Sequence, residues 1–212
     1  MQNSSKIEID SNTTYRPVKS FRTSFGDKLS TFAKKFFDSS QILVVILGIF
    51  ALLYLFIAQF SVVDGPSMLN NFDSGDLTVY EKVTTTLGHL KRGDVVVFQS
   101  PDGRDFIKRV IGLPGESIKV QDGKVYVNEK PLTEDYLSDI NKYVRGGTTY
   151  TEGITITSND KEYALFGDNR TVSHDSRDLG PITLDKIKGK VLVVFWPINK
   201  FHFIKDIQYS NF

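Results

Sequence analysis

A serine and a lysine are the side chains of this sequence that could together carry out nucleophilic catalysis. Ser67 lies in the run Gly65-Pro66-Ser67-Met68, where glycine allows close backbone approach and methionine supplies a flexible apolar wall. A serine hydroxyl needs a base to accept its proton, and histidine is the usual one. The sequence contains three histidines: His89, His174 and His202. The Gly-His-Leu turn around His89 and the terminal position of His202 favour surface histidines at both places.

Lys108 is the better candidate for the base. In the run Phe106 to Ile111, the two-residue period of a strand places Phe106, Lys108 and Val110 on one face. Apolar neighbours disfavour the charged ammonium and lower its pKa, as a base at neutral pH requires. From an ordinary pKa of about 10.4, a drop of about three units, costing about 4 kcal/mol, is needed. The alternation fits equally well a lysine that extends from a sheet edge toward solvent.

The composition excludes several other kinds of site. The sequence has no cysteine, which excludes disulfides, a thiolate zinc site and a cysteine nucleophile. Its 26 basic and 25 acidic residues leave a net charge of +1. Such a small charge gives no argument for nucleic acid as a partner.

A transmembrane helix is expected before Ser67. The apolar run Ile42 to Ala58 carries no charge, and uncharged residues continue to Val63. As a helix this run can cross a hydrocarbon core of about 30 Å, and it lies too far along the chain for a signal-peptide h-region. We therefore predict a transmembrane helix over residues 41–63. Ser67 follows four residues later, so its hydroxyl would lie within about 14 Å of the membrane surface.

The charges on the two sides of this span predict its orientation. Basic residues closely precede it: Arg22, Lys28, Lys34 and Lys35. The first basic residue after it is Lys82. The positive-inside rule then places the N-terminus in the cytoplasm and residues 64–212 outside.

Two further segments precede the span. In residues 21–40, phenylalanine and leucine recur at steps of three and four among basic residues, which indicates a basic amphipathic juxtamembrane helix. It would either lie on the inner leaflet or extend the membrane helix. Residues 1–20 are polar and expected to form a disordered cytoplasmic tail.

Residues 64–212 predict a mostly β fold, an antiparallel β-sheet domain. Short apolar runs alternate with turn residues and show no long helical period. Asp122-Gly123 and Asp102-Gly103 each separate two such runs and predict β-hairpins. Residues 128–161 are polar and indicate an insertion or small subdomain. The remaining core strands are expected at Glu162 to Phe166 and Gly189 to Trp196.

Four motifs, in this order, resemble those of bacterial type I signal peptidases: DGPSM, RGDVVVF, DFIKRVIGLPGE and FGDNRTVSHDSRDLG. The resemblance runs from the membrane segment to the C-terminal strand and covers most of the chain. Its short outer domain is similar to the Gram-positive form of the family. The resemblance implies a membrane-bound Ser/Lys peptidase.

The resemblance also implies roles for single residues. Ser67 would be the nucleophile and Lys108 the general base, with Ser173 hydrogen-bonded to the lysine. The residues that would support the site around them are Asp175, Arg177, Asp168 and Arg170. Without the resemblance, the DNR and DSR runs would indicate a polar turn with ion pairs.

Substrate contacts are implied in the same way. Some members carry an oxyanion-donating serine two residues before the nucleophile, whereas this chain has Gly65, so main-chain N–H groups of Ser67 and Gly65 would form the oxyanion hole. An extended substrate is expected to pair with residues 62–65 and 105–107. The side chains expected at the substrate are those of Met68, Asp105, Phe106 and Ile107, with Met68 and Phe106 walling pockets for alanine-sized residues.

One departure lies close to the nucleophile. Many members have Pro-Thr after Ser-Met-x, and this chain has Asn70-Asn71. The change alters the hydrogen bonds available to the turn but replaces neither catalytic group.

The expected function is a single-pass serine endopeptidase of the cell membrane that removes signal peptides from secretory preproteins after a small-x-small site. The mechanism implies no metal and no cofactor. The expected partners are preproteins and the lipid bilayer, and the secretion translocon is a further candidate; no nucleic acid is expected.

Two alternatives remain. A self-cleaving, repressor-like Ser/Lys peptidase would carry a DNA-binding segment where this chain has a membrane span. A catalytically silent homologue that assists surface-protein or pilus assembly is expected to lack Ser67 or Lys108, and both are present.

Overall fold

The computed structural model describes residues 21–69, 71–137 and 153–209. The chain divides into two compact units, Met1–Phe50 and Ala51–Phe212. The predicted disordered tail, residues 1–20, lies outside the described residues, as does Asn70.

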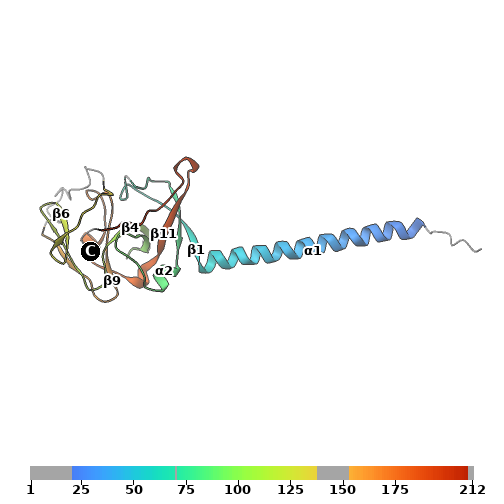
Figure 1. The fold of residues 1–212 in the computed structure, drawn as a ribbon, viewed down its shortest axis with the longest axis horizontal. Coiled ribbons are helices and arrows are strands. Elements are labelled where there is room, and N and C mark those ends of the chain that lie inside the picture. The colour runs from blue at the N-terminus through green and yellow to red at the C-terminus, as the bar shows by residue number, and fades with distance from the viewer. Residues whose placement is uncertain (1–20, 70, 138–152, 210–212) are drawn as a thin grey trace, which may run out of the picture. The chain divides into compact units, whose positions relative to one another are not determined.

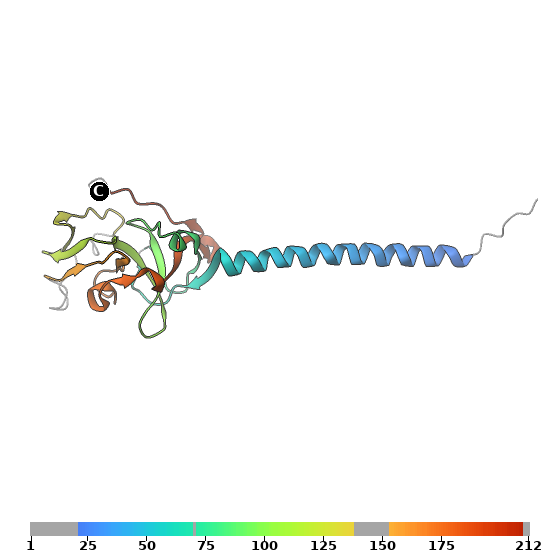
Figure 2. The ribbon, with the colours of Figure 1, turned by 90° about the horizontal axis from the view of Figure 1, so that it is seen from below.

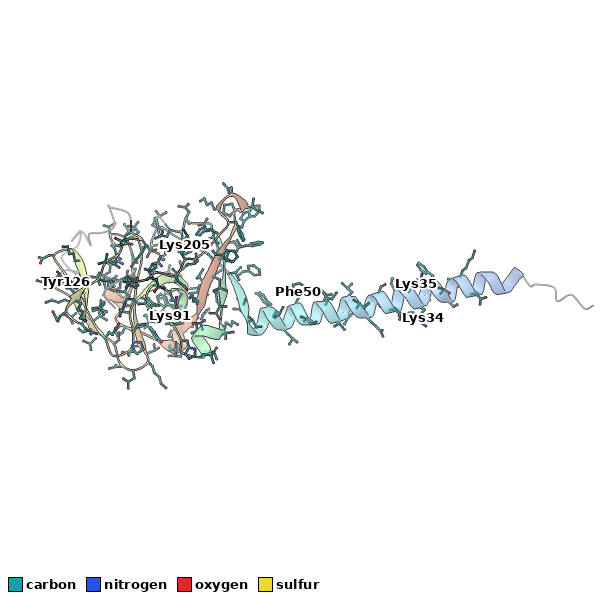
Figure 3. The ribbon with its side chains drawn as sticks, viewed as in Figure 1. Lys34, Lys35, Phe50, Lys91, Tyr126 and Lys205 are labelled. Carbon is teal, nitrogen blue, oxygen red and sulfur yellow. The ribbon has the colours of Figure 1, made fainter. Side chains whose placement is uncertain are left out.

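A single uninterrupted helix, α1, covers Phe21–Phe56 (Figure 1). Its stretch Gly26–Tyr54 is long and apolar enough to cross a membrane, and none of this stretch is buried. Figure 3 shows the side chains of α1, among them Lys34, Lys35 and Phe50, pointing outward from the helix axis. Such an exposed apolar surface is unfavourable in water, so this helix fits a membrane-anchored protein. Because one helix runs through residues 21–40 and onward, the structure favours the extension of the membrane helix over a separate amphipathic helix.

The end of the predicted transmembrane helix is wrong. Residues Ala58–Val62 form a strand, β1, which pairs antiparallel with β2, Leu77–Glu81. The uncharged run from Ile42 to Val63 contains the end of α1 and all of β1. The absence of charge could not show where the helix ends, because the strand that follows is also uncharged. Ser67 therefore follows the helix by eleven residues instead of four, and an extended chain of that length reaches about 40 Å.

The second unit is built on antiparallel strands, which confirms the predicted fold class. Its larger sheet has eight strands in the order β1-β2-β11-β3-β4-β9-β10, with β12 paired to β11. The further strands of this sheet are β3 (Val95–Gln99), β4 (Asp105–Gly112), β9 (Glu162–Phe166), β10 (Ile182–Thr183), β11 (Ile187–Trp196) and β12 (His202–Phe203). The predicted hairpin of β3 and β4 is present, and its green loop projects from the domain in Figure 2.

A smaller sheet has the order β7-β6-β5-β8, with β5 at Ser117–Gln121, β6 at Lys124–Val127, β7 at Lys130–Pro131 and β8 at Thr155–Thr157. The predicted hairpin at Asp122-Gly123 is confirmed, and both residues have the positive φ that a tight hairpin turn uses. This subdomain begins with β5, so the boundary predicted at residue 128 was too late. The prediction of this boundary depended on polar composition. The first hairpin of the smaller sheet, β5 and β6, is apolar, so composition did not include it.

Short helical segments complete the domain: α2 (Val83–Thr86), α3 (Ser176–Leu179), η1 (Leu184–Lys186) and η2 (Ile198–Lys200). Within the described residues, buried apolar side chains form three clusters. One cluster joins Met68 and Phe72, from the candidate nucleophile turn, to Ile107 of β4. A separate cluster contains Val96, Phe98 and Val110.

Candidate active site

Strand β4 holds Lys108 inside the domain. The side chain is 2% exposed, and β4 is flanked by β3 and β9. The alternation predicted for this strand holds, since Ile107 packs in the Met68 cluster whereas Phe106 and Val110 pack with Val96. The Lys108 Nζ donates hydrogen bonds to Ser67 Oγ at 2.8 Å and to the Ile107 carbonyl at 2.9 Å. The structure therefore brings the candidate nucleophile and base together.

Burial lowers the pKa of Lys108 from 10.5 to about 8, against the opposing charges of Asp175 and Asp168. About half of the molecules then carry a neutral amine at pH 8, and about a tenth do so at pH 7. Of the two sequence interpretations, burial of Lys108 is confirmed and a lysine that extends to solvent is wrong.

The turn that carries Ser67 is held from one side by the segment after β9. The Asn169 N–H donates to the Ser67 carbonyl at 3.0 Å, and its side-chain amide donates to the Pro66 carbonyl at 3.1 Å. Close approach is possible because residue 167 is glycine. A Cβ at Gly167 would lie 2.5 Å from the Ser67 carbonyl and 2.2 Å from Ser173 Oγ, both far inside contact distance.

A buried ion pair supports this segment. Arg177 donates to both carboxylate oxygens of Asp175 at 2.8 Å, and Asp175 also accepts from the Gly167 N–H at 2.9 Å. Asp175 is the N-cap of α3 and forms a capping box with Asp178. Although burial opposes the shift, the Arg177 guanidinium holds the pKa of the Asp175 carboxyl below its usual value.

The hydrogen bond expected between Ser173 and Lys108 is not formed. Among the described residues the buried Ser173 hydroxyl has no well-formed hydrogen-bond partner. It lies close enough to Asp175 to help lower the pKa of that carboxyl. The Lys108 Nζ instead donates to Ser67 Oγ and to the carbonyl of Ile107, its neighbour on β4.

A second buried ion pair joins β4 to the same segment. Arg109 donates to Asp168 through Nε at 2.8 Å and through Nη2 at 2.6 Å, and both side chains are almost fully buried. Asn71 Nδ2 donates to Asp168 Oδ2 at 2.8 Å and to the Tyr136 carbonyl at 3.2 Å. Nearby, Arg170 pairs with Glu134 in the segment after β7. The sequence did not predict the contacts of Asn71, Tyr136 and Glu134, because their partners lie 36 to 97 residues away and no local spacing marks them.

A small cleft of about 140 Å³ opens beside Ser67 and Lys108. It is lined by Ser61, Val62, Asp64, Gly65, Pro66, Ser67, Asp105, Phe106, Ile107, Lys108, Val172 and His174. The expected substrate residues Asp105, Phe106 and Ile107 therefore face it. Asp105 is also paired with Lys188 at 2.6 Å.

Met68 does not line this cleft. Its side chain has no exposed surface and packs in the core, where its sulfur accepts the Asp168 N–H at 3.4 Å. The prediction that Met68 walls a substrate pocket is wrong. The turn directs the Ser67 side chain toward the cleft and the Met68 side chain into the core.

The two expected oxyanion donors differ in availability. The Gly65 N–H donates to Ser74 Oγ at 3.2 Å, and Gly65 has φ +84°, which suits glycine alone. No backbone hydrogen bond donated by the Ser67 N–H is found among the described residues, so this N–H is the stronger candidate. Among residues 21–69, 71–137 and 153–209, no group of three or more His, Cys, Asp or Glu side chains could hold a metal ion.

Comparisons with known proteins show the family of this chain. The family model described as signal peptidase, peptidase S26, matches residues 36–196. A signal peptidase I from Bacillus caldolyticus is 36% identical over 159 residues, covering 72% of this chain and 87% of the relative. Signal peptidase IB from Staphylococcus aureus (strain COL) is 36% identical over 150 residues, covering 66% and 78%. A crystal structure of a signal peptidase I from Enterococcus faecalis V583 is 34% identical, with a TM-score of 0.42, and covers 48% of this chain and 95% of that one.

Proposed function

The chain belongs to the bacterial type I signal peptidases of peptidase family S26, and from that premise we propose that Ser67 and Lys108 form its catalytic dyad. Signal-peptide removal is the activity of this family of serine proteases. The observation that carries the dyad is the 2.8 Å hydrogen bond between a buried lysine amine and the serine hydroxyl. The pKa of about 8 supports it, because a base must be partly neutral at the working pH.

In the proposed mechanism, neutral Lys108 accepts the Ser67 hydroxyl proton while Oγ attacks the scissile carbonyl. The Ser67 N–H supports the resulting oxyanion. The Lys108 ammonium then gives its proton to the leaving amine, and the C–N bond breaks to leave an acyl-enzyme. Lys108 next removes a proton from water, which attacks the ester carbonyl. Return of that proton to Ser67 Oγ releases the signal peptide and regenerates the enzyme.

We propose a substrate that is extended and has small side chains next to the scissile bond. The cleft of about 140 Å³ suits alanine-sized side chains. Its lining includes Val62, Asp64 and Gly65 before the nucleophile and Asp105 to Ile107 of β4. An extended peptide would pair with the backbones of these two segments. Both features support cleavage after a small-x-small sequence.

We propose that α1 crosses the cell membrane once, with the N-terminus in the cytoplasm and the β domain outside. The apolar stretch of α1 and the basic residues before it support this orientation. A signal peptide also lies in the bilayer, so enzyme and substrate would meet at the outer surface.

The test is cleavage of a detergent-solubilised preprotein that carries an Ala-x-Ala site. The intact protein should release the signal peptide, and Ser67→Ala and Lys108→Ala should not. Cleavage that persists in either variant contradicts the dyad. A lack of cleavage by the intact protein favours a silent homologue.

A further inference from the structure

The Ser67 hydroxyl can meet Lys108 only if the turn that carries it stays fixed relative to β4. Backbone bonds close this turn on itself, since Asn71 N–H and Phe72 N–H both donate to the Met68 carbonyl at 3.0 Å. Those bonds join residues within the turn, so they do not set the distance between the turn and β4. That distance depends on contacts between the turn and β4 or residues bound to β4.

The side chain of Asn71 makes such a contact. Its amide donates to Asp168 Oδ2 at 2.8 Å, and the same carboxylate binds Arg109 through two hydrogen bonds. Arg109 follows Lys108 directly on β4. A continuous path of hydrogen bonds therefore runs from the nucleophile turn through Asn71, Asp168 and Arg109 to the strand that carries the base.

The contact requires an amide. The Asn71 nitrogen serves two acceptors, Asp168 Oδ2 and the Tyr136 carbonyl, and both are partly or fully buried. An aspartate of the same shape would set a second carboxylate against Asp168 and would leave the Tyr136 carbonyl without this donor. An alanine would remove both bonds but add no repulsion.

We propose that Asn71 is a positioning residue that fixes the Ser67 turn to the Arg109–Asp168 pair and so holds Ser67 Oγ within reach of Lys108. This role rests on the proposed dyad. Asn71 does not line the cleft of Ser67, so its loss changes the geometry of the reacting groups and leaves substrate binding unchanged. A displacement of about 1 Å at a reacting group can lower a rate by about a hundredfold.

The test compares Asn71→Ala, Asn71→Asp and Asn71→Thr in the full chain, with kcat and KM measured per mole of folded protein. We expect kcat to fall about tenfold in Asn71→Ala and about a hundredfold in Asn71→Asp, with KM within about twofold of the intact protein. Asn71→Thr keeps one uncharged donor and should recover part of kcat. Asn159→Ala, at an exposed asparagine in the turn before β9, is the matched control and should leave both constants unchanged.

The order of kcat, with threonine above alanine and alanine above aspartate, is the result that a merely structural role would not produce. Equal kcat in the three variants, or a change confined to KM, overturns the proposal. If Asn71→Ala does not fold, the kcat values of Asn71→Thr and Asn71→Asp test the proposal, and equal values overturn it. Ser67→Ala and Lys108→Ala are assayed in parallel: residual cleavage in either overturns the dyad itself. If both are inactive while the Asn71 variants match the control, this inference alone is wrong.

Discussion

Replacing Lys108 by methionine should stabilise the protein at neutral pH while abolishing cleavage. The pKa of Lys108 is about 8 in the folded protein and 10.5 when unperturbed. This difference corresponds to about 3 kcal/mol of destabilisation of the folded state when the lysine is charged in both states. Methionine has a similar length and removes that cost, but it also loses the bonds of Nζ to Ser67 and Ile107, worth about 1 kcal/mol. The expected net gain at pH 7 is about 2 kcal/mol.

The sign of this effect depends on pH. Because the folded pKa lies below the unfolded one, the destabilisation is complete below pH 8 and disappears as the pH rises through 10.5. Lys108→Met should therefore raise Tm by about 4 to 8 °C at pH 7 and give no rise at pH 10.5, where the remaining charge cost of about 0.4 kcal/mol is smaller than the loss of about 1 kcal/mol from the hydrogen bonds. Thermal unfolding of the full chain in detergent at both values measures this difference.

A matched control is Lys124→Met, at an exposed lysine in β6. It should change Tm by little at either pH, since an exposed lysine pays no desolvation cost. The reasoning is refuted if Lys108→Met lowers Tm at pH 7, or if its gain is the same at both pH values.

Two further substitutions test how the site is held together. Gly167→Ala should lower cleavage by at least about a hundredfold, because a Cβ there would lie 2.5 Å from the Ser67 carbonyl; a rate near that of the intact protein would show that the turn can yield. Arg177→Ala should lower the free energy of unfolding by about 3 to 5 kcal/mol, measured by urea denaturation, because it leaves the buried Asp175 carboxylate without its ion-pair partner. A loss under about 1 kcal/mol would contradict that account.

Local patterns predicted the parts of the fold that local physics decides. The two Asp-Gly turns specify hairpins because aspartate and glycine adopt the required backbone angles, and both hairpins are present. The alternation in β4 correctly placed Lys108 among apolar side chains. The predicted end of the transmembrane helix is wrong. Residues Ala58–Val62 form a strand because they pair with β2, which lies nearly twenty residues later in the chain.

The candidate site was predictable in its chemistry and less so in its contacts. Ser67 and Lys108 were identified by residue type, apolar setting and motif. Met68 is buried, and the Ser173 hydroxyl has no well-formed partner among the described residues. Both depend on how segments distant in the sequence pack, which neither spacing nor resemblance specifies. In the sequence, Asn71 stands out only as a departure from Pro-Thr, and its hydrogen bond to Asp168 joins residues 97 positions apart.

The identity of the base is tested most directly by the pH dependence of kcat/KM. His174 lines the same cleft and is the alternative base that this measurement tests. With Lys108 as the base, kcat/KM should rise with pH to a plateau with a midpoint of about 8, and His174→Ala should leave that midpoint unchanged. A midpoint near 6.5, the ordinary pKa of histidine, that is lost in His174→Ala would contradict the Ser67–Lys108 dyad.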